Sequence, residues 1–482
     1  MSRTSLAVIV GASAALVLPA AGAVAVPGAV DPVPGQRGVA ALVDRPMPGA
    51  QAGRVFAGRL DELARHNGMR TAELREVLTK DRTAWVDQDA RLYYVEPMSP
   101  EMQARATAGD KANAKKPPQP PQPPTGAGPV APALSSLPGA SKVIYIDFNG
   151  HTISGTAWNA GGGPASVNVT PYDTDGSPST FSAAENAVIT ETWQRIAEDY
   201  APFNVNVTTV DPGADAINRS STADANYGSR LLIDPTSWYQ AGCGCGGVAY
   251  VGVFDSANNG YNQPALVFTQ GVGNGAKNIA EAGSHEVGHN LGLSHDGTAT
   301  VGYYTGHGAW APIMGVGYSK AISQWSKGEY ANANQHQDDI VVMGQNGAAV
   351  KAADHGTTTA TATAITPGTT ATGVTTTAAD VDHFRVQLAA GSHTFTASPA
   401  AVGANVDVEL TVLDSAGAEL GRWNPASGQT SASTATGLGA TGTLTLAAGT
   451  YYVRVDGSGF ADPLTTGYTD YGSIGAFSVR VD

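Results

Sequence analysis

Three histidines within eleven residues place the strongest constraint on how this chain can fold. The segment from His285 to His295 reads His-Glu-Val-Gly-His-Asn-Leu-Gly-Leu-Ser-His. On a helix, His285 and His289 lie on one face, one turn apart. Gly292 is a natural end for that helix, because glycine reaches the left-handed conformation at low cost. The chain can then turn and bring His295 back to the other two imidazoles.

These imidazoles have the chemistry of zinc ligands. Three histidine nitrogens, each about 2.0–2.1 Å from the ion, leave the fourth position of a tetrahedral zinc site for water, which is typical of a catalytic site. Glu286 projects beside His285 and His289, near enough to take a proton from that water without being a ligand. The pattern therefore predicts a hydrolytic Zn²⁺ site with His285, His289 and His295 as ligands and Glu286 as general base.

The same eleven residues match the signature of the metzincin zinc endopeptidases, which also have a methionine turn downstream. Ala311-Pro312-Ile313-Met314-Gly315 supplies that turn. The resemblance implies that Met314 lies beneath the zinc site as an apolar floor and is not a ligand. Asp296, directly after the third histidine, makes the site similar to reprolysin-like members.

A tyrosine near the methionine turn is a further candidate for the site. Astacin-like and serralysin-like metzincins have a tyrosine two residues after the methionine, where this chain has Val316. Tyr318, two residues further on, is the residue that could help to hold the developing oxyanion. The resemblance thus adds Tyr318, Asp296, Met314 and the turn residue Gly292 as supporting residues.

Two other stretches extend the resemblance. Residues 193–205 are similar to secreted bacterial metalloproteases of this class. Residues 380–384 and 449–453 resemble the bacterial pre-peptidase C-terminal domain. That resemblance implies a β-sandwich appended to the protease and often removed on maturation.

The N-terminus has the pattern of a secretory signal peptide over residues 1–25. Basic Arg3 is followed by an apolar run from Leu6 to Pro19 and then by small residues that end at Ala25. A membrane anchor is the alternative, but the run is shorter than the roughly 20 residues that a spanning helix needs. We therefore expect a secreted, extracellular protein without a membrane anchor.

Residues 26–113 are expected to be a pro-segment, and residues 114–135 a proline-rich linker. The pro-segment pattern predicts a helix from Thr71 and strands near Trp85 and over 92–95, and Lys115-Lys116 opens the linker. An ordinary N-terminal domain with a hinge is the alternative. As a pro-segment it would be the enzyme's own intramolecular inhibitor. It contains no cysteine, so a thiolate cannot block the zinc, whereas an acidic residue or steric coverage could.

The rest of the chain predicts two domains. Strands interleaved with long helices over 136–350 indicate a mixed α/β catalytic domain, in which Ser182 and Glu185 fit a capping box. Gly247–Val253 is the candidate strand for antiparallel binding of a peptide substrate, and an internal strand is the alternative. Short alternating strands over 351–482 indicate an all-β sandwich.

Charge excludes one class of function and suggests an interaction. The chain has 41 acidic and 27 basic residues, for a net charge of −14, which argues against nucleic-acid binding. Residues 26–135 carry a net +2 and residues 136–482 a net −17. We hypothesise that this contrast helps the pro-segment to dock on the enzyme, an effect that salt would weaken.

Two weaker signals leave alternatives open. Asp338-Asp339 and the acidic residues of the C-terminal block are more typical of a solvated acidic face, with a structural Ca²⁺ site as the alternative. Cys243 and Cys245 are the only cysteines, and a disulfide across one residue is compatible with an oxidising compartment.

Together these features predict a secreted zinc endopeptidase that cleaves peptide bonds in proteins. A catalytically weak binding or adhesive protein on the same scaffold is the alternative. Inactive relatives typically lose the base or a ligand, but Glu286 and all three histidines are present here. Hydrolysis of a non-peptide amide or ester on the same zinc is a third reading that the sequence leaves open.

Overall fold

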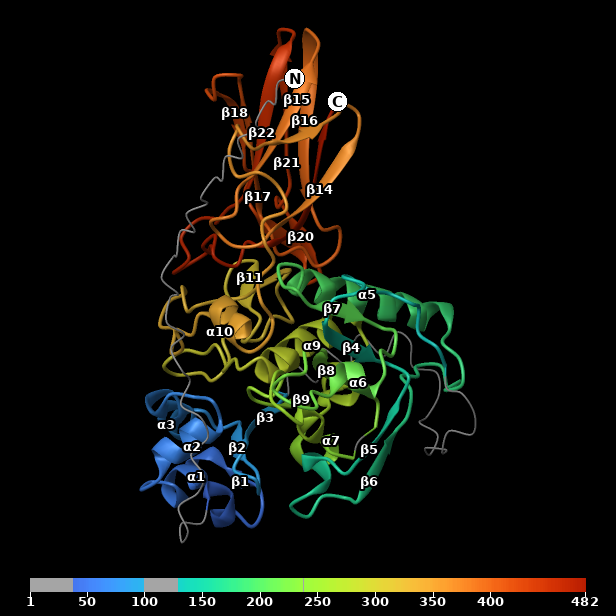
Figure 1. Cartoon of the computed structure of the whole chain (residues 1–482), viewed down its shortest axis with the longest axis vertical. Helices are drawn as coiled ribbons and strands as arrows, with labels where there is room; N and C mark the ends of the chain where they lie inside the picture. Colours follow the sequence, from blue (N-terminus) through green and yellow to red (C-terminus); the bar gives the residue numbers. More distant parts are fainter. Residues whose placement is uncertain (1–37, 99–128, 237) are drawn as a thin grey trace, which may run out of the picture. The chain divides into compact units, whose positions relative to one another are not determined.

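The computed structural model describes residues 38–98, 129–236 and 238–482. The expected signal peptide and most of the expected linker lie outside these ranges. Figure 1 shows, in chain order, a small helical module, a mixed α/β region and a strand-rich C-terminal region. The predicted combination of a mixed α/β domain with a C-terminal β-sandwich is confirmed.

Residues 39–98 form a module with its own hydrophobic core. The expected helix begins at Thr71 and buries Leu74, Val77 and Leu78 against Phe56 and Leu63. Val77 and Leu78 follow Leu74 by three and four residues, which puts the three side chains on one face of the helix. The elements are η1 (Val39–Leu42), β1 (Met47–Pro48), α1 (Gly49–Val55), α2 (Leu60–His66), α3 (Thr71–Lys80), β2 (Ala84–Val86) and β3 (Leu92–Pro97).

The module's strands extend the central sheet of the α/β region. Strand order is β1-β2-β3-β9-β10-β8-β4-β7. The pairs β4–β7, β4–β8 and β8–β10 are parallel, whereas β9 is antiparallel to both β10 and β3. The strands after the module are β4 (Lys142–Asp147), β7 (Asn206–Thr208), β8 (Tyr227–Asp234), β9 (Cys245–Tyr250) and β10 (Ala265–Phe268).

Helices cover both faces of this sheet because its side chains alternate. In β4, Ile144 and Ile146 join the main core, and Val143 and Tyr145 pack with Ile217 of α6. Helices α5 (Ala183–Asp199) and α9 (Ala276–Asn290) pack together on the main-core side (Figure 1). The capping box predicted at Ser182 and Glu185 begins α5.

Shorter elements complete this region. They are β5 (His151–Ser154), η2 (Ala157–Asn159), β6 (Ser166–Val169), α6 (Ala214–Ile217), α7 (Gln240–Cys243), η3 (Asn259–Asn262), α8 (Thr269–Val272), β11 (Trp310–Pro312), β12 (Ile322–Gln324) and α10 (Asp339–Gln345). The paired strands β11 and β12 flank the turn that contains Met314.

The C-terminal region is a two-sheet sandwich. One sheet has the order β13-β15-β22-β17-β18 and the other β14-β23-β16-β21. Alternate residues such as Phe384, Val386, Val453 and Phe477 fill the space between the sheets. The strands are β13 (Thr363–Ile365), β14 (Thr370–Thr375), β15 (Asp382–Leu388), β16 (Gly391–Pro399), β17 (Val408–Leu413), β18 (Glu419–Trp423), β19 (Gly428–Ser431), β20 (Thr434–Thr436), β21 (Ala440–Leu446), β22 (Gly449–Gly457) and β23 (Gly475–Val481).

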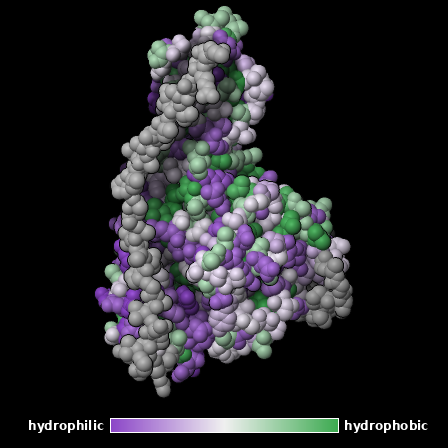
Figure 2. Space-filling view, viewed as in Figure 1, coloured by the Kyte–Doolittle hydropathy of each residue, from purple (hydrophilic) through white to green (hydrophobic). Residues whose placement is uncertain are grey.

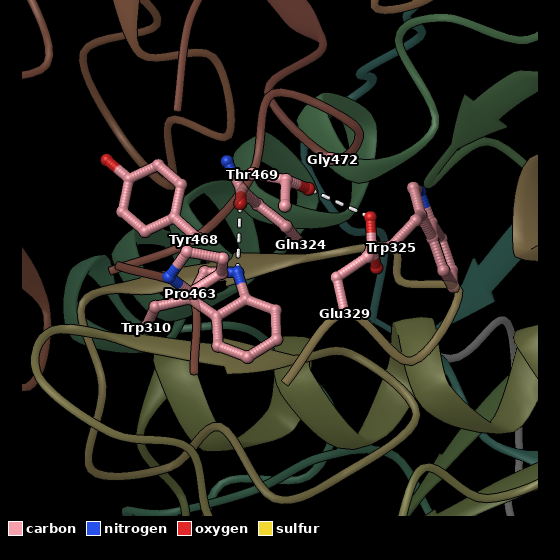
Figure 3. A pocket seen from close by; sticks show the side chains of 8 residues that line it. All are labelled: Trp310, Gln324, Trp325, Glu329, Pro463, Tyr468, Thr469 and Gly472. Carbon is pink, nitrogen blue, oxygen red and sulfur yellow. Dashed lines mark hydrogen bonds between the residues drawn. The ribbon is translucent and has the colours of Figure 1, made fainter. Parts of the chain in front are cut away.

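Polar contacts join the sandwich to the α/β region. Thr469 donates a hydrogen bond to Glu329 at 2.8 Å, and nearby Trp310 donates to Gln324 at 2.9 Å; all four residues line a small pocket (Figure 3). Asn405 donates to the buried carboxylate of Asp199, the last residue of α5, at 2.9 Å. The sandwich therefore rests on the same helix that packs beside α9.

Hydrophilic and hydrophobic residues are interspersed on the face shown in Figure 2. Across the residues that the structure describes, no helix is both long and apolar enough to span a bilayer.

Candidate active site

Helix α9 carries the first two histidines and ends where the sequence pattern placed its end. The helix runs to Asn290, and Gly292 has φ +94° with its N–H bonded to the His289 carbonyl at 2.8 Å. A Cβ at Gly292 would lie 2.8 Å from Nδ2 of Asn346. The left-handed glycine thus turns the chain away from the helix and returns it at His295.

Each histidine is held by its Nδ1 atom, so that its Nε2 faces a common point. His285 Nδ1 donates to the carbonyl of Ile313 and His289 Nδ1 to the carbonyl of Leu293, both at 2.8 Å. A carbonyl can only accept, so Nδ1 carries the proton and Nε2 presents a lone pair. Such second partners fix the orientation of metal-binding histidines.

The donor set fits a tetrahedral zinc ion. His289 Nε2 and His295 Nε2 are 3.0 Å apart, and the ligand atoms of His285, His289, His295 and Glu96 all lie within 4.8 Å of one another. Bonds of the usual zinc–nitrogen length give ligand separations of about 3.3 Å in a tetrahedron. The observed separation is close to this value and the Nε2 atoms converge, so these residues could hold the metal.

Glu286 lies beside the histidines with its carboxylate free. It is fully buried, and neither oxygen has a hydrogen-bond partner within the described ranges. A Cβ on Gly247 of β9 would come within 1.7 Å of Oε1, so the base fits only because that strand has a glycine there. Burial, and then the facing charge of Glu96, raise the pKa of Glu286 well above its ordinary value.

Met314 lies under the helix that carries the ligands. Its side chain is fully buried, and its Sδ would be 2.6 Å from a Cβ on Gly288, the residue just before His289. Its carbonyl accepts from Asp296 N at 2.8 Å, which ties the turn to the third histidine's segment. The structure thus places Met314 as an apolar support beneath the site.

The carboxylate of Asp296 lies against Tyr330. It is 2% exposed, and its Oδ1 lies 3.4 Å from the hydroxyl of Tyr330. Burial, followed by the charge of Glu329, raises the pKa of Asp296 to about 7. Among the described residues, the ligand atoms that converge on the metal position belong to Glu96, His285, His289 and His295, and not to Asp296.

Two tyrosines lie near the histidines. Burial, and then the charges of Glu96 and Glu286, raise the pKa of Tyr318, which packs against the main core. Sequence reasoning missed Tyr303, whose ring centroid is 4.3 Å from that of His295. Tyr303 has no ligand spacing or motif position, and only the fold of the loop after His295 brings it to the site.

The larger surprise is that the N-terminal module supplies two carboxylates. Glu96 Oε1 lies 2.9 Å from His285 Nε2, 2.9 Å from His289 Nε2 and 3.3 Å from His295 Nε2. Asp81 Oδ2 accepts from His295 Nδ1 at 2.7 Å.

Gly247–Val253 was predicted to be either an edge strand that binds substrate or an internal strand, and the structure has features of both. Strand β9 (Cys245–Tyr250) covers the first part of Gly247–Val253 and pairs with β10 along one edge. Its other edge is free of residues from the α/β region and pairs with β3 of the module. Within the α/β region β9 is therefore an edge strand, and the module makes it internal.

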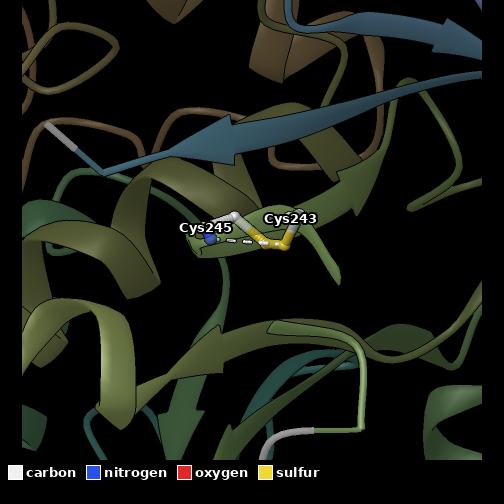
Figure 4. The surroundings of a disulfide bond; sticks show 2 residues. All are labelled: Cys243 and Cys245. Atoms are coloured by element: carbon white, nitrogen blue, oxygen red, sulfur yellow. Dashed lines mark hydrogen bonds between the residues drawn. A yellow bond between two sulfur atoms is a disulfide. The ribbon is translucent and has the colours of Figure 1, made fainter. Parts of the chain in front are cut away.

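A disulfide joins Cys243 and Cys245 at the beginning of β9, with Cα atoms 5.1 Å apart (Figure 4). Gly244 between them accepts a hydrogen bond from Met98 N at 3.0 Å, just beyond the end of β3. The disulfide thus lies beside the residue that follows β3 of the module.

The expected calcium residues have other roles in the structure. Asp338 caps α10 by accepting from Val341 N at 3.1 Å, and Asp339 accepts from Ser326 N at 2.9 Å. Elsewhere, Asp173 Oδ1 accepts three backbone N–H groups of its own turn. These contacts give calcium no support.

Residues 167–296 match the sequence model of Metallo-peptidase family M12B, Reprolysin-like. No curated protein matches the chain. The solved pre-peptidase C-terminal domain of collagenase from Bacillus anthracis is 12% identical, with a TM-score of 0.18, and the match covers 25% of this chain and 94% of that one. PliG of Aeromonas hydrophila, a periplasmic inhibitor of g-type lysozyme, is 17% identical over 25% of this chain and 96% of its own, with a TM-score of 0.16. At these scores the likenesses support no inference about activity.

The convergent histidines and the buried Glu286 have the arrangement expected of a metallopeptidase site of the metzincin class. The match of residues 167–296 to the reprolysin-like M12B model agrees with the predicted family resemblance. The matched segment ends at Asp296, so it contains the three histidines and Glu286 but neither Met314 nor Tyr318.

Proposed function

We propose that the chain is the precursor of a secreted, zinc-dependent endopeptidase. The observation that carries this proposal is the convergence of three buried Nε2 atoms beside the free carboxylate of Glu286. In this proposal His285, His289 and His295 hold the ion, and residues 39–98 belong to a pro-segment. Secretion rests on the sequence pattern of residues 1–25.

The chain's own residues divide the work of hydrolysis. Zinc supplies Lewis acidity, which polarises a carbonyl and makes water a nucleophile near neutral pH. Glu286 accepts the proton of the attacking water and passes it to the leaving amine. Tyr318 and Tyr303 are candidates for donating hydrogen bonds to the developing oxyanion.

Substrate binding is proposed to use the free edge of β9. An extended peptide that pairs antiparallel with β9 gains main-chain hydrogen bonds, which are independent of side-chain identity. Gly247 has no side chain, which lets Glu286 lie directly beside this strand. Such binding suits a protein substrate better than a small ester or amide, which has no strand to pair.

The test is Glu286→Ala in the processed enzyme, with casein as substrate. We expect cleavage to fall by about 10²–10⁴-fold, the usual contribution of a general base, with zinc content unchanged. Glu191→Ala is the control, because Glu191 is an exposed glutamate on α5 that pairs with Arg195. Unchanged cleavage by Glu286→Ala would refute the role of Glu286, and less than about half an equivalent of zinc in both proteins would refute the three-histidine site.

Secretion and processing have a separate measurement. N-terminal sequencing of the protein in the culture medium should show loss of residues 1–25, followed by loss of the pro-segment. Protein that stays in the cell with its original N-terminus would contradict this part of the proposal.

A further inference from the structure

The N-terminal module pairs with β9 in the manner proposed for a substrate. Strand β3 pairs antiparallel with β9, with Tyr94 opposite Ala249 and Glu96 opposite Gly247. Gly247 is the residue that makes room for Glu286, so this register delivers Glu96 to the reacting centre. A protein substrate that needs the same edge of β9 is therefore excluded while β3 is in place.

Glu96 then takes the position that a catalytic site keeps for water. Its Oε1 is 2.9–3.3 Å from all three Nε2 atoms, which is close to the separation between ligands of a tetrahedral zinc site. Carboxylate oxygens are ordinary zinc ligands. With Glu96 in place, Glu286 faces a second carboxylate instead of the water from which it would take a proton.

The module also orients the third histidine. Asp81 follows α3 directly, and its Oδ2 accepts from His295 Nδ1. A carboxylate behind a metal-bound histidine fixes its ring and raises its basicity. The ring of Tyr94 covers the site, with centroids 4.4 Å from His289 and 4.1 Å from His295.

The position of β3 is held by contacts away from the metal. Asn67 Oδ1 accepts from Leu92 N at 2.8 Å, and the Leu92 carbonyl accepts from Val251 N at 3.0 Å. Val251, from the residues just after β9, is buried in the module's own core. These contacts fix the register independently of Glu96, so Glu96 arrives at the histidines pre-positioned.

We propose that Glu96 is the fourth ligand of the metal in the precursor, that Asp81 supports His295 as a positioning residue, and that this carboxylate keeps the enzyme latent. The inference rests on the proposed function, because it requires a zinc ion on the three histidines. The pro-segment has no cysteine, so the carboxylate of Glu96 would do what a thiolate cannot do here.

Zinc release from the full-length precursor tests the ligand directly. The measurement uses a Glu286→Ala background, which prevents self-cleavage. Zinc transfer to a colorimetric chelator is followed for the parent, which has Glu96, and for its Glu96→Gln and Glu96→Asp variants. We expect transfer to be about tenfold or more faster for Glu96→Gln and intermediate for Glu96→Asp, which retains a carboxylate. Glu76→Gln is the matched control: it makes the same charge change on exposed α3, where Glu76 pairs with Lys80.

A second readout uses the precursor with Glu286 intact. We expect Glu96→Gln precursor to cleave a peptide substrate before processing, whereas the parent and Glu76→Gln stay latent. Zinc content and thermal melting of each variant show whether the module is still folded, and Glu96→Asp provides a variant closer to the parent if Glu96→Gln melts early.

The outcomes separate this inference from the proposed function. If all variants bind one zinc but release it at the parent's rate and remain latent, Glu96 is not the ligand, although the zinc enzyme stands. If the parent precursor binds no zinc, the proposed function itself fails. Faster zinc release confined to the Glu96 variants supports the inference.

Discussion

Glu198 offers a test of how the sandwich is attached to the catalytic region. It lies near the end of α5, is 4% exposed, and accepts a hydrogen bond from Ala476 N of β23 at 3.0 Å. A Cβ on Gly475 would lie 2.2 Å from its Oε1. Burial, and then the charge of Asp199, raise the pKa of Glu198 from 4.5 to about 8.

The raised pKa makes stability depend on pH with a definite sign. Between pH 4.5 and 8 the folded protein keeps a proton on Glu198 that the unfolded chain has lost, so stability is fully present below pH 4.5 and falls as the pH rises through 8. At 1.36 kcal/mol per pKa unit, the loss between pH 5 and pH 8 is about 3 kcal/mol. Glu198→Gln keeps the shape without the charge and should remove this loss.

Thermal melting of wild type and Glu198→Gln at pH 5 and pH 8 measures the effect. We expect similar Tm values at pH 5 and a Tm for the variant higher by roughly 3–4 °C at pH 8, because unfolding entropy grows with chain length. Glu419→Gln is the control, because Glu419 is half exposed on β18 and pairs with Arg422. An equal drop in Tm for wild type and Glu198→Gln between the two pH values would refute the reasoning.

Three further substitutions probe the site. Gly247→Ala places a methyl group against Glu286 Oε1, so peptide cleavage should fall by about 100-fold with zinc retained, and parental activity would contradict this. Met314→Ala empties a fully buried position beneath the histidines and should lower the free energy of unfolding by about 2–5 kcal/mol in urea titrations; a change below the error of the fit would argue against the packed floor. Gly292→Ala forces a side chain into φ +94° beside Asn346, and should cost about 1–3 kcal/mol and speed zinc loss to a chelator, whereas parental zinc retention would show that the turn adapts.

The catalytic helix was predictable because its signals are local. The histidine spacing, the glycine at the helix end and the capping box on α5 each act within a few residues, and the structure has α9 and α5 where these patterns predict them. Tyr303 lay beyond such reasoning, because its approach to His295 depends on a loop path that no spacing records. The charge contrast between the chain's two parts did not point to Glu96 either.

The sequence by itself determined which groups the site can use: three imidazoles and one carboxylate on a helix and its turn, and an N-terminal region without a thiol. Only the tertiary structure decided what lies opposite them. The contact between Glu96 and His289 spans 193 residues, and it depends on the register of β3 on β9. A shift of one residue would turn Glu96 to the other face of the sheet, because side chains alternate along a strand. Register is set by the packed core and the paired strands together, so the nearby sequence alone could not reveal it.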